Sequence, residues 1–352
     1  MKMRPYDIGR VVVRAPTWVG DAVMSVPALR ELRVLLPAAH ITVAAQPGTA
    51  DVFLGADFID HVMPIESGFF ASVGQLRRGK FDLALLFQNA FSAAARAVAA
   101  RIRFRIGYHS DRRAPLLTTA LPIPAWKNER HESFYYLNIV AELERMLFRS
   151  TRIANAQPQF ELAVSEDRKN QAQALLEQKG ALPDRPLAII CPGSVNSRAK
   201  RWPAERYAEL CDRLSGGGMN VVLIGSAAEM DVSNDVCARA KHDPIVLTGK
   251  TAVGEMISLI SVADVLVTND TGPAHIGAAM GTPTLVIFGP TNPLTTFPMS
   301  PHAQIIREPP DCAPCMLRDC PIDHRCMTAL SVDSVFKKAL VVMRRDQVQT
   351  TG

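Results

Sequence analysis

Four short segments of the sequence combine a small-residue turn with charged or hydroxyl side chains. The fullest is VLVTNDTGPAHIGAA (265–279), in which an apolar β-branched run reaches an Ala-rich stretch through Asp270, Thr271 and Gly272. This order predicts a buried strand followed by a helix, with Pro273 in the first helical turn. The free N–H groups and the helix dipole favour an anion there, and Gly272 admits it close to the backbone. The alternative is that Asp270 or Thr271 only caps the helix.

The second segment, CPGSVNSRAKRWP (191–203), brings cations to a turn that also follows an apolar strand. Gly193 and Ser194 can present backbone and hydroxyl donors, and Lys200 adds positive charge together with two arginines. Such a set suits a leaving group that accumulates negative charge. The segment is therefore a candidate phosphate-binding loop.

The third segment, APTWVGD (15–21), places a carboxylate after the first predicted strand. We expect Gly20 to permit a tight turn and Asp21 to begin a helix. Asp21 could take a proton from a substrate hydroxyl, or it could act only as a helix cap. The segment is no dinucleotide fingerprint, because the G-x-G-x-x-G pattern is absent.

The fourth segment, GSAAEMD (225–231), again follows an apolar run. An acid at this position could bind the two hydroxyls of a ribose, with Glu229 the first candidate and Asp231 the second. A role in the first turn of a helix is the alternative for either side chain.

Strand and helix patterns alternate along the chain, which predicts an α/β fold with two doubly wound parallel sheets. The predicted strands are 11–16, 40–46, 61–65, 81–87 and 105–109 in the first half, and 187–193, 219–226, 244–250, 263–270 and 284–290 in the second; the predicted helices are 21–36, 90–100, 166–179 and 331–345. We place the domains at 1–180 and 181–352, with the last helix able to return to the first domain. Ligands of such sheets bind at the carboxyl ends of strands, so the four segments should face one cleft.

Composition is consistent with two sizeable cores, since 48% of the 352 residues are hydrophobic. No window offers the roughly 18 to 20 apolar residues that a membrane span needs. The first residues, MKMRPYDIGRVVVRAP, contain only a short apolar run that Arg14 interrupts. They predict a strand and no signal peptide, so we expect a cytoplasmic protein.

Arginine is concentrated between residues 96 and 113, where Asp111 is the single acid. The arginines are Arg96, Arg101, Arg103, Arg105, Arg112 and Arg113. Such a run suits an anionic partner, either a phosphorylated substrate or an acidic lipid surface, although a solvated helix face is an equal alternative. Nucleic acid is disfavoured because no recognised binding motif accompanies the charge.

Four of the seven cysteines, Cys312, Cys315, Cys320 and Cys326, lie close together in the sequence. In a reducing compartment this spacing indicates a metal site or packed thiols before disulfides. A structural zinc ion held by four thiolates is chemically possible. The other three, Cys191, Cys211 and Cys237, have the setting of ordinary buried residues.

Taken in order, PTWVGDAVMSVPALRELR, CPGSVNSRAKRWPAERYAEL, VVLIGSAAEMD and TNDTGPAHIGAAMGTPTLVIFGPTNP resemble the ADP-heptose:lipopolysaccharide heptosyltransferases, glycosyltransferase family nine. PTWVGD with PG…AKRWP is most similar to the heptosyltransferase II group, and the cysteine-rich CAPCMLRDCPIDHRCM is similar to a segment of many members. The resemblance implies a GT-B fold, in which two Rossmann-like domains face a central cleft. The first would hold the acceptor and the second the nucleotide sugar.

The resemblance also implies roles for single residues. Asp21 would be the general base, with Gly20 beside it, and Lys200 would hold the donor phosphate and stabilise departing ADP. Glu229 would bind the ribose. The residues expected near the heptose and diphosphate are Ser194, Asp270, Thr271, Gly272 and His275.

By this resemblance the chain is an inverting, metal-independent transferase that needs no cofactor. It would move heptose from ADP-heptose to the first heptose of the lipid A-core acceptor, heptosyl-Kdo2-lipid A, as a cytoplasmic enzyme in peripheral contact with the inner membrane. Transfer to Kdo, or of another sugar, is an alternative. Two others are a sugar-nucleotide 2-epimerase and a non-catalytic binding module that uses the cysteine cluster.

Overall fold

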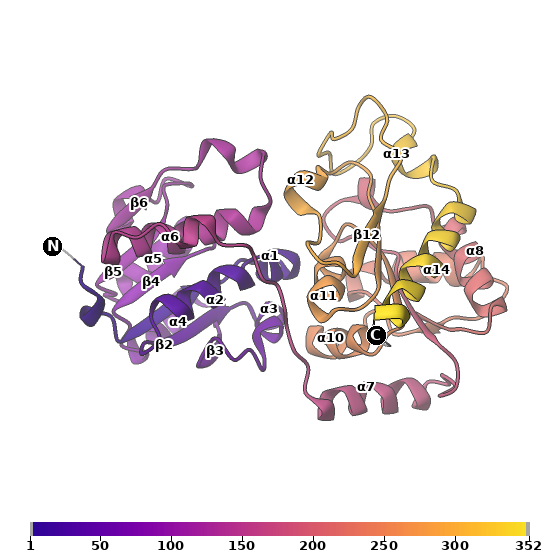
Figure 1. The fold of residues 1–352 in the computed structure, drawn as a ribbon, viewed down its shortest axis with the longest axis horizontal. Helices are drawn as coiled ribbons and strands as arrows, with labels where there is room; N and C mark the ends of the chain where they lie inside the picture. Colours follow the sequence, from indigo (N-terminus) through magenta and orange to yellow (C-terminus); the bar gives the residue numbers. More distant parts are fainter. Residues whose placement is uncertain (1–2, 350–352) are drawn as a thin grey trace. The chain divides into compact units, whose positions relative to one another are not determined.

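The computed structural model describes residues 3–349, and these form two compact units, each built on its own sheet (Figure 1). The first unit ends at Phe160 and the second begins at Glu161. Each sheet has six strands, and every strand pair is parallel. The predicted α/β class with two doubly wound sheets is therefore confirmed.

The first sheet has the strand order β3-β2-β1-β4-β5-β6. Its strands are β1 (Arg10–Arg14), β2 (His40–Ala45), β3 (His61–Pro64), β4 (Leu83–Leu86), β5 (Phe104–Tyr108) and β6 (Thr119–Leu121). Its main helices are α1 (Val19–Met24), α2 (Val26–Leu35), α4 (Phe69–Arg78), α5 (Phe91–Ala99) and α6 (Glu132–Phe148), with a short α3 (Pro47–Ala50). β1 lies at the centre between β2 and β4, so the segment that follows it opens at the middle of the carboxyl edge.

The helix predicted over 21–36 is in fact two helices, α1 and α2, that meet at Ser25. The hydroxyl of Ser25 donates to the carbonyl of Ala22 at 2.7 Å. Pro27 lies in the first turn of α2 and has no N–H to donate to the preceding turn, so the α-helical ladder is interrupted here. The break separates the short helix that carries Asp21 from the longer α2.

The second sheet has the order β12-β11-β10-β7-β8-β9. Its strands are β7 (Leu187–Cys191), β8 (Asn220–Leu223), β9 (Ile245–Val246), β10 (Val265–Asn269), β11 (Thr284–Ile287) and β12 (Ala303–Ile306). Its helices are α7 (Glu166–Gln178), α8 (Ala204–Gly216), α9 (Met230–Cys237), α10 (Val253–Ser261), α11 (Gly272–Met280), α12 (Pro293–Thr296), α13 (Arg325–Thr328) and α14 (Val332–Gln349). β7 and β10 are adjacent at the centre, which brings the 191–203 segment next to the 265–279 segment.

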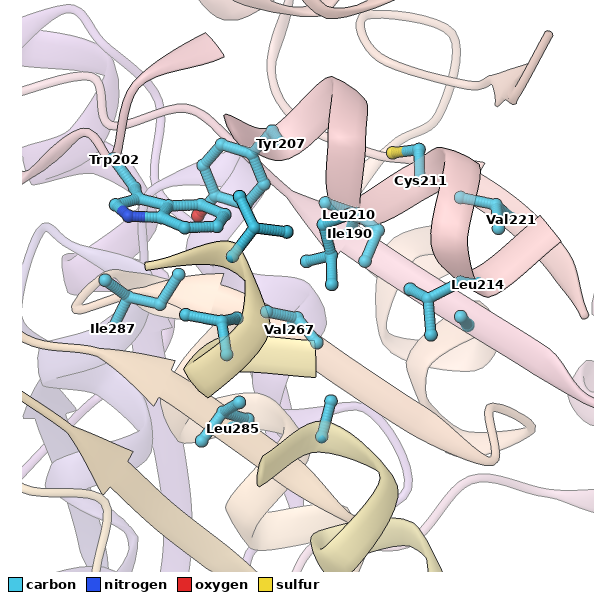
Figure 2. Close-up of a cluster of buried hydrophobic side chains, with 14 of the residues drawn as sticks. Ile190, Trp202, Tyr207, Leu210, Cys211, Leu214, Val221, Val267, Leu285 and Ile287 are labelled. Carbon is cyan, nitrogen blue, oxygen red and sulfur yellow. The ribbon is translucent and has the colours of Figure 1, made fainter. Parts of the chain in front are cut away.

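The core of the second unit lies under α8 and α14 (Figure 2). The Trp202 and Tyr207 rings pack edge to face at 5.0 Å between centroids, above the apolar side chains of β7, β10 and β11. Cys191 and Cys211 are buried, as expected, and the half-buried Cys237 packs against this core. This packed core supports the polar residues at the carboxyl ends of β7 and β10.

Two helices near the ends of the second unit bear on the predicted domain limits. α7, which we placed before the boundary at 180, contacts α10 and belongs to the second unit (Figure 1). α14, which we expected to be able to return to the first domain, packs against α8 and the strands of the second sheet. Among the described residues, no helix is long and apolar enough to cross a membrane.

Candidate active site

An ion pair between the half-buried Lys200 and the buried Asp270 joins two of the predicted segments in the second unit. The Lys200 ammonium donates to the Asp270 side chain at Oδ2 (3.1 Å) and to the Asp270 main-chain carbonyl (2.9 Å). The hydroxyls of Thr291 and Thr296 donate to the same Oδ2 at 2.6 and 3.3 Å. Because Asp270 is only 2% exposed and already accepts from three side chains, it fixes the position of Lys200.

The start of α11 is open to an anion beside this pair. Thr271 is the N-cap residue, but no side chain caps the helix, and the first turn contains no acid. The alternative that Asp270 or Thr271 merely caps α11 is therefore wrong. Pro273 has no N–H, and the Ala274 N–H donates to the Thr271 carbonyl at 3.1 Å, so the Gly272 N–H is the donor at this helix start. Together with the Lys200 cation it makes a site for an oxyanion such as phosphate.

Asn269 holds the two segments together, and the sequence analysis did not single it out. Its amide nitrogen donates to the carbonyls of Pro192 (2.9 Å) and Gly193 (3.1 Å). Its amide oxygen accepts from the main-chain N–H of Trp202 (3.2 Å) and from the Tyr207 hydroxyl (2.9 Å). The sequence does contain one signal for Asn269. It is a polar amide at the end of an apolar strand, and a buried amide must find hydrogen-bond partners.

Ser194 and Glu229 lie at the ends of β7 and β8. Ser194 is buried, and its carbonyl accepts from the Arg201 guanidinium at 3.0 and 3.2 Å. Glu229 forms a capping box with Ser226, whose N–H and hydroxyl each donate to Oε2 at 2.7 Å. The helix-start role considered for Glu229 is thus present in the structure, and Oε2 is already occupied.

Gly193 leaves room for the other oxygen of this carboxylate. A Cβ added at Gly193 would lie 2.4 Å from Glu229 Oε1, so any larger residue would displace the acid. The second candidate acid, Asp231, pairs instead with Arg201 at 3.5 Å. Of the two, Glu229 is the acid that lies against the glycine of the 191–203 segment.

His275 lies in α11, buried beside Lys200 and Asp270. Burial lowers its pKa to about 4, and the nearby Lys200 charge acts in the same direction while Asp270 opposes it. The imidazole is therefore neutral at physiological pH and adds no charge to the Lys200–Asp270 pair.

We expect this neutral imidazole to make the protein less stable in mild acid. The unfolded-state pKa is about 6.5 and the folded-state pKa is about 4, so protonation favours the unfolded chain as the pH falls from 6.5 towards 4. The full effect is about 3 kcal/mol of unfolding free energy. His275→Gln should remove it, so that urea unfolding at pH 7, 5.5 and 4 gives a shallower decline for the variant. Parallel declines for the two proteins would contradict this.

Asp21 and Gly20 lie in the first unit, in the first turn of α1. Gly20 does not form the tight turn we predicted before the helix, because it is itself helical. The Tyr136 hydroxyl, from α6, lies 3.4 Å from Asp21 Oδ1 and donates to it. Burial raises the pKa of Tyr136 well above 10, and the Asp21 charge adds to this, so the phenol stays protonated. Nothing in the sequence marked Tyr136, which is one aromatic among several in its helix.

Two residues of the arginine-rich 96–113 run have structural roles. Arg113 is fully buried and donates to the Tyr108 carbonyl at 2.8 Å and to Asn89 Oδ1 at 2.9 Å. Arg105 donates to the carbonyl of Leu116 at 2.8 Å. The run is therefore not one continuous face for an anionic partner.

The four clustered cysteines differ in their surroundings. Cys312 is exposed, Cys315 and Cys320 are half-buried, and Cys326 is buried. Burial raises the pKa of Cys326 to about 11, with the neighbouring thiols adding to the effect. Across residues 3–349, no three or more His, Cys, Asp or Glu side chains are arranged as ligands of a metal ion. The zinc site stays a prediction, which metal analysis of the purified protein would check.

One protein-family model matches most of the chain. The model of "Glycosyltransferase family 9 (heptosyltransferase)" matches residues 70–325. The chain belongs to glycosyltransferase family 9. It is 31% identical to "Lipopolysaccharide heptosyltransferase 2" of Salmonella typhimurium over 316 residues, which cover 85% of this chain and 88% of the relative.

Two solved structures share the fold of this chain. "E. coli ADP-heptose lps heptosyltransferase II" is similar with a TM-score of 0.83 and 26% identity, over 96% of this chain and 99% of that one. "E. coli heptosyltransferase WaaC with ADP" has the same fold, with a TM-score of 0.67 and 16% identity over 95% and 99% of the two chains. The two Rossmann-like units are thus those of a GT-B glycosyltransferase.

The structure brings one part of the predicted site together within the second unit. Lys200, Asp270, Thr271, Gly272 and His275 lie around the start of α11. Ser194 and Glu229 lie at the adjacent strand ends, while Gly20 and Asp21 belong to the first unit.

Proposed function

We propose that this family 9 enzyme transfers heptose from ADP-heptose to the first heptose of the lipopolysaccharide inner core, heptosyl-Kdo2-lipid A. One observation carries the proposal: the Lys200 ammonium lies beside an uncapped helix start at the carboxyl end of a central strand. A nucleoside diphosphate suits this arrangement of a fixed cation and the N–H end of a helix. The similarity to lipopolysaccharide heptosyltransferase 2 supports the choice of sugar and acceptor.

The reaction is a single displacement with inversion. The acceptor hydroxyl oxygen attacks the anomeric carbon of the heptose, its proton passes to Asp21, and the bond from that carbon to the diphosphate oxygen breaks. ADP leaves with the bonding electron pair. Asp21 is the proposed base, and Tyr136, which donates to its Oδ1 at 3.4 Å, would help to orient the carboxylate.

The second unit would bind the donor and stabilise the leaving group. Lys200 and the positive dipole end of α11, with its Gly272 N–H, would supply positive charge where negative charge develops on the diphosphate, so the step needs no metal. Asp270 holds Lys200 in place, and Glu229 Oε1 is the oxygen available for the ribose hydroxyls. Ser194, Thr271, Gly272 and the neutral His275 would line the diphosphate and heptose.

An acceptor that carries lipid A would bring the enzyme to the cytoplasmic face of the inner membrane in peripheral contact. The proposal assigns the acceptor to the first unit, which carries Asp21, and the donor to the second, which carries Lys200.

Acceptor-dependent release of ADP tests the proposal. Purified enzyme with ADP-heptose and heptosyl-Kdo2-lipid A should release ADP and add one heptose mass to the acceptor, as measured by mass spectrometry. Kdo2-lipid A should be a poor acceptor; if it is used equally well, the alternative of transfer to Kdo is favoured. Equal ADP release without any acceptor, as an epimerase-type reaction would give, or no release at all, would contradict the transferase proposal.

A further inference from the structure

A long segment of the second unit packs against the loop that carries Lys200. Within the described chain, residues 307–324 join β12 to α13 through turns alone, with no helix or strand between them (Figure 1). Connections of this length are uncommon in compact domains and usually have a function of their own. The proposed reaction makes no use of this connecting segment, although it contains three of the four clustered cysteines.

The connecting segment holds the residues just before Lys200 through hydrogen bonds to its own carbonyls. The Ala199 N–H donates to the Arg318 carbonyl at 2.9 Å. The Ser197 hydroxyl lies 3.2 Å from both the Leu317 and the Arg318 carbonyl oxygens and donates to them. Ser197 and Ala199 are 7% and 3% exposed, so water hardly competes for these bonds. Lys200 therefore follows directly on main chain that the connecting segment fixes.

His324, the last residue of the connecting segment, holds the other polar main-chain group of Ala199. Its Nε2 lies 2.6 Å from the Ala199 carbonyl oxygen. Because a carbonyl oxygen only accepts, Nε2 carries the hydrogen and donates it. The Ala199 N–H is bonded to Arg318 and its carbonyl to His324, so a rotation of this residue would break at least one of the two bonds. The two bonds set the direction in which the chain enters Lys200.

The backbone of His324 has a conformation that residues other than glycine rarely adopt. Its φ is 57° and its ψ is 29°, in the left-handed region. The His324 N–H donates to Cys320 Sγ at 3.3 Å, and the His324 carbonyl accepts from the N–H groups of Met327 and Thr328 at 2.9 and 3.0 Å. Met327 is fully buried in the core of the second unit. The imidazole is thus anchored to the core, and a costly backbone conformation kept in this way is typical of functional sites.

We propose that His324 is a positioning residue for Lys200. The proposal rests on the proposed function, in which Lys200 stabilises the departing ADP. His324 fixes the main chain at Ala199 and Asp270 fixes the ammonium, so Lys200 is held at both ends before the donor binds. A cation that is already in place need not reorganise as negative charge develops on the diphosphate. Loss of the His324 bond should therefore slow transfer more than it weakens ADP binding.

Two substitutions of similar length separate the hydrogen bond from the size of the side chain. Glutamine and methionine are both unbranched at Cβ, but only the glutamine amide can donate to the Ala199 carbonyl. His324→Met should lower kcat about 10- to 100-fold, the scale of a displacement of about 1 Å at a catalytic group. It should raise the Kd for ADP only about threefold, because the ammonium is still present. His324→Gln should stay within about twofold of the original in both quantities.

The matched control is His242→Met, the same change at an exposed histidine of the second unit. The His242 side chain is 57% exposed, and its Nδ1 lies 3.3 Å from Asp212 Oδ1. This variant should transfer heptose at the original rate in steady-state kinetics. If His324→Met also does so, or if His324→Gln is as slow as His324→Met, the bond to Ala199 does not position Lys200 and the proposal is wrong.

The same change in a Lys200→Met background distinguishes positioning of the lysine from general support of the fold. Once the lysine is absent its position no longer matters, so His324→Met should lower kcat no further and leave the Kd for ADP unchanged. A merely structural role predicts an equal loss in both backgrounds, and that result would overturn the proposal. Thermal unfolding of His324→Met and His324→Gln should differ by about 2 to 4 °C, the contribution of one hydrogen bond.

Two outcomes separate this proposal from the proposed function. In the first, the original enzyme does not transfer heptose to heptosyl-Kdo2-lipid A, yet His324→Met weakens ADP binding, His324→Gln restores it and the effect disappears in Lys200→Met. His324 then positions Lys200, and the proposed acceptor is wrong. In the second, the original enzyme transfers heptose and His324→Met matches it in both kcat and ADP binding. The proposed function then stands, and His324 has no positioning role.

Discussion

Asp21→Asn should reduce kcat for heptose transfer by a factor of about 10² to 10⁴, the usual contribution of a general base. The amide keeps the size of the carboxylate and can still accept from the Tyr136 hydroxyl, so the fold should be unaffected. It cannot take the proton of the attacking hydroxyl. Because the proposed donor residues all lie in the second unit, the Kd for ADP should stay within about twofold. Steady-state kinetics at saturating donor and acceptor, together with calorimetric titration of ADP, measure the two quantities.

The matched control for Asp21→Asn is Asp57→Asn in the same unit. The Asp57 side chain is 86% exposed, and its Oδ1 lies 3.9 Å from Arg30 Nη1. An ion pair this long and this exposed is too weak to affect catalysis. This variant should turn over at the original rate. Near-normal turnover by Asp21→Asn would show that another group accepts the proton, and loss of ADP binding by Asp21→Asn would show that its effect is not confined to the acceptor side.

The fold could be predicted from the sequence wherever burial alone decides the local structure. Ten strands were predicted from short apolar runs, and all ten are present. Eight of them are interior strands, which are buried on both faces, whereas β3 and β9 are partly exposed edge strands that were found from their apolar residues alone. β6 was missed because its three residues, Thr119–Leu121, are partly exposed at the sheet edge and carry no such run. β12 was missed in the same way: Ala303–Ile306 is also an edge strand, and three of its four residues are only half-buried.

The candidate site was predictable to the level of segments, but not of individual contacts. The turns after β1, β7, β8 and β10 were found because small residues and charges follow apolar runs. Sequence spacing could not reveal that Ser226 occupies Glu229 Oε2, or that Arg113 turns inward while Arg96 reaches toward Ser72. Those outcomes depend on which carbonyls and hydroxyls of distant segments lie nearby after folding. Asn269 and Tyr136 were missed for the same reason, since each acts through partners more than sixty residues away.

Lys200→Met should weaken ADP binding about tenfold or more and reduce kcat by a further factor of about 10² to 10³. The first effect is the loss of a charge-assisted hydrogen bond to the diphosphate. The second arises because the charge of the departing ADP grows in the transition state, so the lost cation matters more there than in the ground state. ADP titration and steady-state kinetics measure the two effects, and Lys241→Met, an exposed lysine of the same unit, is the control. Normal kcat with weak binding would limit Lys200 to holding the donor.

The same substitution also has a cost in stability, which must be separated from its effect on catalysis. Asp270 is 2% exposed, and without Lys200 its charge would keep only the hydroxyls of Thr291 and Thr296. Removing one partner of a buried pair typically costs about 3 to 5 kcal/mol of unfolding free energy; Lys200 is 24% exposed, so the lower end is expected here. In Lys200→Met/Asp270→Asn the uncompensated charge is gone, so stability should recover while transfer stays low. If transfer recovered together with stability, Lys200 would serve the fold alone, and the positive charge at the leaving group would have to come from another residue.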